Sequence, residues 1–415
     1  MAAARSVRIV REVTRPTILH LAVDYNTPHR APTTRAIEWF VDELRAFDNV
    51  VIALRRSAHP RRALVRECPS ANGRVFDMPY FGLPMGLGLH SAMRKAADRI
   101  IALLERQGIR PDLVHAHKLT FEGLAGWYVA RHFGVPLFVS LRGEVETKVF
   151  RYKPRLRRTL RSIADYATRL YFVSAWFESE FSRHAPGNAA KHRRLPNIVR
   201  NIGPVIEGAE AGDRFLAVLN LDTRKRKGLD WLLDGVALAV RANPAIKLDI
   251  IGDGSTRSVD AVTKTIAARG LEKCVRLEGS LSNAALLARM SQYRGLVLPS
   301  LNETFGMVYV EALFAGIPII YTAGTGIDGY LDGLEVGIAV PPRDATSICA
   351  AVLEIWDRSD EMRANIRAAA PTLFAIFDPE ASLAAYRDDV LATISNAATG
   401  KSLAPDVAPL HAANS

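Results

Sequence analysis

The sequence of 415 residues has few cysteines and no long hydrophobic run. Cys68, Cys274 and Cys349 are far apart and lack the spacing of metal ligands, so we interpret them as reduced thiols rather than as disulfides. No stretch approaches roughly eighteen uninterrupted apolar residues, so no membrane-spanning helix is expected. The basic segment 1–16 lacks an apolar core of about seven residues, so no secretory signal is expected either. We therefore expect a cytoplasmic protein.

Acidic residues are outnumbered by basic ones. The 54 Lys and Arg residues against 43 Asp and Glu residues give a formal net charge of +11, which favours an anionic partner such as nucleic acid, an acidic membrane or a phosphorylated substrate. The most basic segment is 151–161, with Arg151, Lys153, Arg155, Arg157, Arg158 and Arg161. Aromatic residues are sparse there, so no nucleic-acid partner is expected. The segment is either the solvated face of a core helix or a surface that binds anionic lipid. The sequence leaves both interpretations open.

Apolar strands alternate with amphipathic helices along the chain. This alternation predicts an α/β protein in which parallel sheets are covered on both faces, and the length suits two domains. The expected strands include 17–23, 49–54, 111–117, 214–219, 246–251 and 296–298. The expected helices include 34–47, 89–107, 229–239 and 377–394.

The stretch 296–316 combines a strand, a turn and a helix. The apolar residues 296–298 predict a buried strand, residues 299–302 a turn, and the spacing from Thr304 onward a helix. Free N–H groups and the helix dipole make such a helix start a site for an anion, and Gly306 lets a ligand approach the backbone. On one continuous helix, Glu303 and Glu311 would lie about 12 Å apart on the same side. By themselves, two glutamates at this spacing are also typical of a helix surface.

The sequence around the two glutamates forms a specific motif. Ser300-x-x-Glu303-x-Phe305-Gly306-x-x-x-x-Glu311-Ala-x-x-x-Gly316-x-Pro318 resembles the signature of retaining glycosyltransferase family 4, which has a Glu-x7-Glu pattern. The resemblance is strong over 214–342 and looser before it. It implies a GT-B fold, in which two Rossmann-like doubly wound domains face a cleft. It also implies metal-independent, retaining transfer of a hexosyl group from a nucleotide-diphosphate sugar to a hydroxyl acceptor. The setting implied is polysaccharide or lipid-linked saccharide synthesis, with a saccharide or lipid-linked saccharide acceptor and no cofactor besides the donor.

Composition and the resemblance together assign domains, and the resemblance assigns site residues. The expected domains are an N-terminal segment 1–16, an acceptor-side domain 17–203, a linker 204–213, a donor-binding domain 214–375, a helix 376–395 that crosses back onto the first domain, and a disordered tail 396–415. Glu303 is expected to hold donor-sugar hydroxyls and Glu311 the nucleotide ribose. The expected catalytic residues are Glu303, Lys227, Arg224 and His117. The expected donor-binding residues are Glu311, Thr304, Phe305, Gly306, Met307, Val308, Gly252, Gly254, Arg226 and Arg142.

The sequence departs from the family at four places, one of which is Asp328, where relatives often have a glutamate after the glycine turn 324–326. The family has an arginine five residues before a Lys-Gly pair, whereas Asp222 precedes Lys227 here, so Arg224 or Arg226 takes the role of that arginine. Arg142 replaces a histidine, and either binds an anion or is an ordinary surface residue. The loop 24–33 lacks the paired glycines common in the family.

His115-x-His117 ends the strand 111–117 with a spacing that metal ligands use, but no third ligand is recognisable nearby in the sequence. We expect no metal site, a structural role for His115, and a position facing the cleft for His117. The alternative function is that of a catalytically silent relative acting as a membrane-surface or scaffold protein. Peripheral contact with the inner face of the cell membrane is left open.

Overall fold

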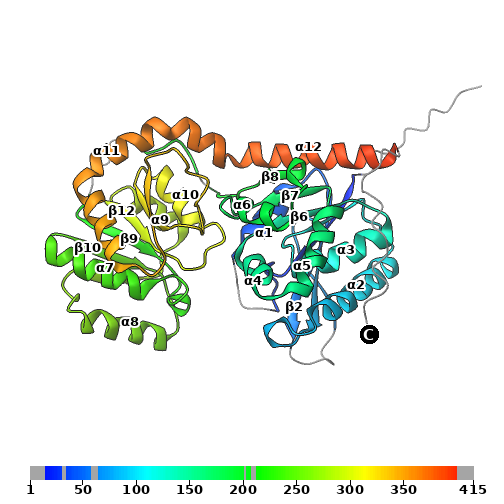
Figure 1. The fold of residues 1–415 in the computed structure, drawn as a ribbon, viewed down its shortest axis with the longest axis horizontal. Helices are drawn as coiled ribbons and strands as arrows, with labels where there is room; N and C mark the ends of the chain where they lie inside the picture. The colour runs from blue at the N-terminus through cyan, green and yellow to red at the C-terminus, as the bar shows by residue number, and fades with distance from the viewer. Residues whose placement is uncertain (1–14, 30–33, 58–63, 201, 207–211, 400–415) are drawn as a thin grey trace, which may run out of the picture. The chain divides into compact units, whose positions relative to one another are not determined.

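The computed structural model describes residues 15–29, 34–57, 64–200, 202–206 and 212–399, and these form two sheets flanked by helices (Figure 1). The first sheet has eight strands in the order β3-β4-β2-β1-β5-β6-β7-β8, and the second has six in the order β11-β10-β9-β12-β13-β14. The strands of the first sheet are β1 (Thr17–Ala22), β2 (Asp48–Ser57), β3 (Arg66–Cys68), β4 (Arg74–Phe81), β5 (Leu113–Ala116), β6 (Leu137–Leu141), β7 (Arg169–Phe172) and β8 (His192–Arg194). Those of the second are β9 (Arg214–Val218), β10 (Lys247–Ile251), β11 (Val275–Gly279), β12 (Gly295–Leu298), β13 (Ile319–Thr322) and β14 (Gly337–Val340).

Helices follow most of the strands. Those before β9 are α1 (Ala36–Glu43), α2 (Leu89–Arg106), α3 (Phe121–Phe133), α4 (Glu144–Tyr152), α5 (Pro154–Tyr166) and α6 (Phe177–His184), with short 3-10 turns η1 (Pro84–Gly86) and η2 (Ala189–Lys191). Those after β9 are η3 (Leu221–Thr223), α7 (Leu229–Ala242), α8 (Thr256–Ala268), α9 (Asn283–Met290), α10 (Met307–Phe314), α11 (Ala345–Phe377) and α12 (Pro379–Ala398). This alternation confirms the predicted α/β class.

The central strands explain why the sequence predicted parallel sheets. β1 pairs in parallel with β2 and β5, and five of its six residues are buried. In the second sheet, β9 pairs in parallel with β10 and β12, and β12 with β13. Strands covered on both faces need continuous apolar sequence, which is the pattern these segments show. β3 is antiparallel to β4.

Residue contacts divide the described chain into two compact units. One contains the residues up to His117, Phe121–Phe138 and α12 from Val390 onward, and the other contains Lys118–Thr120 and the residues from Val139 to Asp389. The limits expected from the sequence, 17–203 and 214–375, stay a prediction. Much of the expected linker and tail, and residues 1–14, lie outside the described residues.

The final helix is held against the first sheet. The expected helix 377–394 corresponds to α12, which begins after α11 ends and extends to Ala398. One carboxylate oxygen of Asp389 accepts a hydrogen bond from Arg169 Nε at 2.7 Å, and the other accepts one from the Tyr171 hydroxyl at 2.9 Å. Both partners lie on β7, and Tyr386 packs against Tyr171 with ring centroids 5.5 Å apart. The helix expected to cross back therefore contacts the eight-stranded sheet.

Among the described helices, none combines the length and the apolar character that crossing a membrane requires.

We predict that Asp389→Ala destabilises the protein by about 1–3 kcal/mol, because the substitution leaves two part-buried donors on β7 without their acceptor. Asp388→Ala is the matched control, since Asp388 is the exposed neighbour on the same helix. Urea unfolding of both variants measures the difference. Equal midpoints would show that the Asp389 contacts do not hold α12.

Candidate functional site

Three loops meet at one edge of the six-stranded sheet. They follow β9, β12 and β13, which are neighbouring parallel strands, so their carboxyl ends lie side by side. In open α/β sheets this edge is where ligands bind. The three loops carry Lys227, Glu303 and Thr325.

The first two loops touch through their backbones. Gly228 has a φ of +71°, and a Cβ on it would lie 2.1 Å from the carbonyl oxygen of Pro299. The N–H of Leu301 donates to the carbonyl oxygen of Arg226 at 2.9 Å. Only glycine allows this approach, and the approach sets Lys227 beside the turn after β12.

Lys227 and Glu303 form an ion pair that is largely shielded from solvent. The ammonium of Lys227 donates to Oε2 of Glu303, and the two side chains are 16% and 12% exposed. The backbone of Glu303 is fixed by the third loop: its N–H donates to Thr325 Oγ1 at 2.8 Å, and its carbonyl accepts from the N–H of Gly326 at 2.9 Å. The carboxylate is therefore held at a defined position next to one cation.

The helix of the motif begins later than expected. Helix α10 starts at Met307, not at Thr304, because Gly306 has a left-handed φ of +78° and interrupts the helix. A Cβ on Gly306 would lie 2.4 Å from the ring of Tyr309. Glu303 is thus in the loop before the helix, and the expectation that Glu303 and Glu311 share one continuous helix is wrong. The helix start still presents the N–H groups of Met307 and Val308, which have no intrahelical acceptor.

Phe305 anchors the turn rather than lining a surface. Its side chain is buried and packs edge-on against Tyr330 and Phe377, with ring centroids 5.6 and 6.0 Å apart. Only the backbone of Phe305 is therefore a candidate for ligand contact. The roles predicted for Thr304 to Val308 stay predictions.

Glu311 lies on α10 and is half-buried. One of its carboxylate oxygens accepts a hydrogen bond from Asn283 Nδ2 at 3.2 Å. Burial raises the pKa of the Glu311 carboxyl, and the hydrogen bond from Asn283 opposes that rise. A carboxylate in this setting gains stability from additional hydroxyl donors.

The departure at Asp222 has a structural cause. Its carboxylate accepts hydrogen bonds from the hydroxyl of Ser255 at 2.6 Å and from the N–H of Ser255 at 3.0 Å, and these bonds lower the Asp222 pKa. Arg224 makes a contact within the protein, because its Nη1 donates a hydrogen bond to Ser258 Oγ at 3.1 Å. Arg226 is exposed and adjoins Lys227. Of the two arginines left open by the sequence, Arg226 is better placed to meet an anion beside Lys227.

The glycine turn after β10 packs on the same loop. A Cβ on Gly252 would lie 1.8 Å from the carbonyl oxygen of Leu219, and one on Gly254 would lie 2.9 Å from Leu221 Cβ. These glycines allow close packing between loops, and whether they also contact a donor stays a prediction.

The two remaining predicted residues, Arg142 and His117, precede β9 in the sequence. Arg142 is 6% exposed, and its Nη1 lies 3.5 Å from Asn197 Oδ1. It is therefore not the surface residue that the sequence left as an alternative. His117 is 3% exposed, and its Nε2 lies 3.2 Å from Nδ1 of His20. Its catalytic role stays a prediction.

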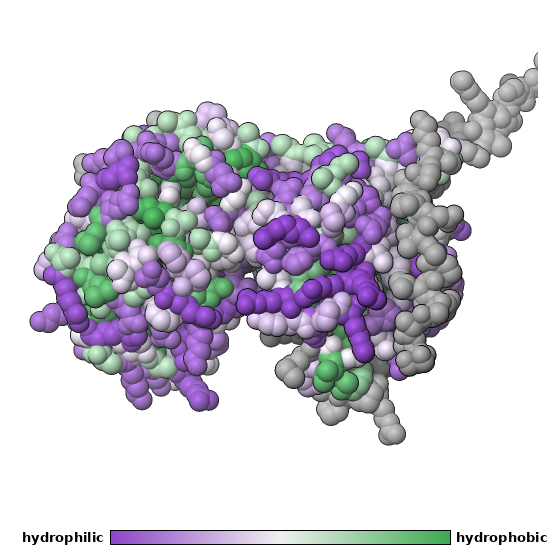
Figure 2. Space-filling view, viewed as in Figure 1, coloured by the Kyte–Doolittle hydropathy of each residue, from purple (hydrophilic) through white to green (hydrophobic). Residues whose placement is uncertain are grey.

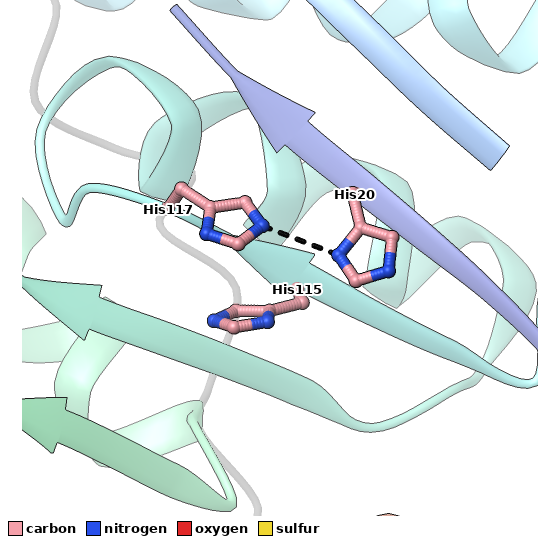
Figure 3. Close-up of side chains that lie close together, drawn as sticks. All are labelled: His20, His115 and His117. Carbon is pink, nitrogen blue, oxygen red and sulfur yellow. Dashed lines mark hydrogen bonds between the residues drawn. The ribbon is translucent and has the colours of Figure 1, made fainter. Parts of the chain in front are cut away.

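Sequence reasoning missed three residues near these positions. Thr325 fixes the Glu303 backbone, and its signal was a Gly-Thr-Gly turn directly after an apolar strand. Asn283 binds Glu311 and had no local signal. His20 joins His115 and His117 in one cluster (Figure 3), and it was hidden in the apolar run of β1. Burial lowers the His20 pKa to about 4, against a smaller opposing effect of its hydrogen bond to Asn49.

Comparison with known proteins identifies similar sequences and folds. The family "Glycosyl transferase 4-like domain" matches residues 33–197, and the family "Glycosyl transferases group 1" matches residues 212–358. Glycogen synthase of Mycobacterium tuberculosis is 27% identical over 323 residues, which are 73% of each chain. Sucrose-phosphate synthase from Thermosynechococcus elongatus has a TM-score of 0.69 at 20% identity, over 91% of this chain and 100% of that one. HepE from Anabaena, solved in complex with UDP, has a TM-score of 0.67 at 16% identity, with the same coverage.

The two sheets and the similar structures define a GT-B fold. The two family matches together span about three quarters of the sequence. The chain belongs to the family 4 type of glycosyltransferase, which transfers sugar from a nucleotide-sugar donor in polysaccharide or glycoconjugate synthesis.

We predict that Gly228→Ala destabilises the protein by clearly more than Gly270→Ala. Both glycines have positive φ, but a Cβ on Gly270 has no neighbour within 4 Å, whereas one on Gly228 meets the Pro299 carbonyl. The control variant isolates the cost of the backbone conformation, about 1 kcal/mol, from the cost of the clash. Chemical unfolding compares the two, and equal losses would refute the contact. Only Gly228→Ala is expected to reduce transferase activity as well.

Proposed function

We propose that the protein transfers a hexose with retention of anomeric configuration from a nucleotide-diphosphate sugar to a hydroxyl acceptor, without a metal ion in the transfer step. The observation that carries the proposal is the meeting of Lys227, Glu303 and the start of α10 at one edge of the second sheet. This edge offers a cation and backbone donors for a diphosphate and a carboxylate for sugar hydroxyls. UDP-sugars are the first donors to test, because HepE was solved with UDP.

Donor binding would exchange the partners of the ion pair. The diphosphate takes the ammonium of Lys227 and the N–H groups of Met307 and Val308, where the helix dipole also favours negative charge. Glu303 then accepts hydrogen bonds from the sugar hydroxyls in place of Lys227. Since both charges are shielded in the free protein, the donor must satisfy both of them at once.

The chemical step uses the same groups. The bond between the anomeric carbon and the phosphate oxygen breaks, and both of its electrons go to that oxygen. The acceptor hydroxyl forms the new bond on the face that the phosphate leaves, and its proton goes to the departing phosphate. Lys227 and Arg226 stabilise the charge that grows on the phosphate, which is the largest contribution that a preorganised site makes.

Glu311 would bind the nucleotide end of the donor. A carboxylate accepts two hydrogen bonds from neighbouring ribose hydroxyls, and Asn283 fixes its orientation by occupying one oxygen. Because burial raises the Glu311 pKa, this carboxylate is protonated at a higher pH than an ordinary glutamate. Donor affinity is therefore expected to weaken at a pH at which an ordinary glutamate is still ionised.

We predict that Lys227→Met and Glu303→Gln each lower the turnover number by about 10²–10³-fold, because each removes a group that stabilises the donor or its leaving phosphate. Lys247→Met is the matched control, since Lys247 makes an exposed ion pair with Asp213 in the same unit. Steady-state assays with the donor found in a thermal-shift screen measure the effect. Unchanged turnover in both site variants would contradict the assigned roles.

The alternative of a catalytically silent scaffold predicts a different result in the same screen. A silent relative would show neither heat nor a thermal shift with any common nucleotide sugar, whereas the proposed enzyme binds at least one. Donor titration therefore separates the two hypotheses before an acceptor is known.

We also propose that α4 and α5 bind an anionic membrane surface. On α5, Leu160, Ile163 and Ala164 are buried, while Arg155, Arg158 and Arg161 are exposed. Tyr152, at the end of α4, is 67% exposed, and the guanidinium of Arg151 lies 5.4 Å from its ring centroid. Figure 2 shows a strongly hydrophilic surface over these two helices. Binding of such a polybasic face to a membrane with acidic lipid is stabilised by about 1 kcal/mol for each basic residue near the surface.

We predict that the triple variant Arg155→Glu, Arg158→Glu, Arg161→Glu sediments with phosphatidylserine liposomes much less than the natural protein does. Lys264→Glu, Lys273→Glu, Arg276→Glu is the control, since it makes the same charge change at exposed residues on α8, on β11 and in the connection between them. An equal loss of sedimentation in both triple variants would show that liposome binding depends on net charge alone and not on α4 and α5. Equal sedimentation with neutral and anionic liposomes would exclude the proposal.

A further inference from the structure

Three histidines come together on one face of the first sheet. His20 on β1 is the direct register partner of His115 on β5, and His117 follows two residues later. The N–H of His117 donates to the carbonyl oxygen of Leu21 at 3.0 Å, so the strand pairing continues past Ala116. Residues two apart on a strand point to the same face, which places all three imidazoles together (Figure 3).

The spacing of the ring nitrogens is that of metal ligands. One nitrogen from each ring lies within 4.8 Å of the other two, and His20 Nδ1 lies 3.2 Å from His117 Nε2. Two ligand nitrogens at about 2.0–2.1 Å from a tetrahedral zinc ion are themselves about 3.3 Å apart.

Asn49 orients His20 for this role. The Asn49 amide nitrogen donates to the carbonyl oxygens of Leu44 at 2.9 Å and Phe47 at 3.3 Å, so its Oδ1 must be the atom that faces His20. His20 Nε2 lies 3.1 Å from that oxygen and therefore carries the proton. Nδ1 of His20 is then left with a lone pair that points at His117. An oxygen acceptor behind a ligating imidazole is the usual outer partner of a metal-binding histidine.

The surroundings enclose the cluster. His20 and His115 are fully buried, and the ring of Phe40 packs edge-on against His115 and His117 at 6.0 and 5.9 Å. His20, His115, His117, Asn49 and Phe40 all belong to one compact unit.

We propose that His20, His115 and His117 bind one divalent transition-metal ion, of which Zn²⁺ is the best match to three neutral imidazoles. The ion would tie β1 to β5 and so stabilise the first sheet. The ion takes no part in the proposed transfer mechanism. In this assignment His117 is a structural ligand rather than the catalytic residue that the resemblance implied, and the expectation of no metal site is replaced.

The test uses the full chain, produced without a histidine tag and refolded from denaturant in the presence of Zn²⁺ or Co²⁺, because a buried site must fill as the protein folds. We expect about one equivalent of metal per chain after gel filtration, measured by inductively coupled plasma mass spectrometry. We also expect the thermal midpoint to rise by about 3 °C or more over protein refolded with chelator.

The variants His20→Gln and His115→Gln are expected to lose both the metal and the thermal shift. His90→Gln and His132→Gln are the controls, since these histidines are hydrogen-bonded to Tyr128 and Glu105 outside the cluster. Absence of metal in the natural protein, or equal metal in the cluster variants, would overturn the proposal and leave a purely hydrogen-bonded cluster. If the variants do not fold, X-ray absorption of the Zn²⁺-loaded natural protein decides: three imidazole ligands support the site, and fewer overturn it.

Discussion

The contact of Gly228 with the backbone of Pro299 is the constraint on which the candidate active site depends. It brings the loop after β9 against the loop after β12, and the hydrogen bond between Leu301 and Arg226 fixes the register of the two segments. Lys227 can reach Glu303 only because the backbone beside it has no side chain in the way. The Lys-Gly sequence is therefore one structural unit, in which the glycine determines where the lysine points.

The ion pair that results is both a product of the fold and a condition for ligand binding. Two charges shielded from water stabilise each other, and separating them without replacement would be costly. A diphosphate linked to a sugar offers an anion for Lys227 and hydroxyl donors for Glu303 in a single molecule. A free phosphate or a free sugar would satisfy only one of the two. This requirement is a physical reason why such a site would prefer the intact donor to either of its parts.

Much of the fold could be predicted because it is recorded in local patterns. The apolar runs of β1, β9 and β12 and the Lys227-Gly228 pair are visible in the sequence. What could not be predicted depends on neighbours distant in the chain. The start of α10 shifted to Met307 because Gly306 takes a left-handed conformation to make room for Tyr309. The cluster of His20 with His115 follows from the register of β1 against β5, and no local spacing reveals a partner 95 residues away.

At Asp222 the sequence departs from the family pattern, and the residue there has a structural role in its loop. An arginine is expected at this position by resemblance, yet the carboxylate of Asp222 binds both donors of Ser255 at the start of α8, and an arginine could not accept those bonds. Arg224 is held by Ser258 on the same helix, so the loop is fixed by two side chains that face α8. Arg226 remains exposed next to Lys227. In the proposed transfer, Arg226 and Lys227 would supply the positive charge at the diphosphate, because the position that supplies it by resemblance is occupied in holding the loop.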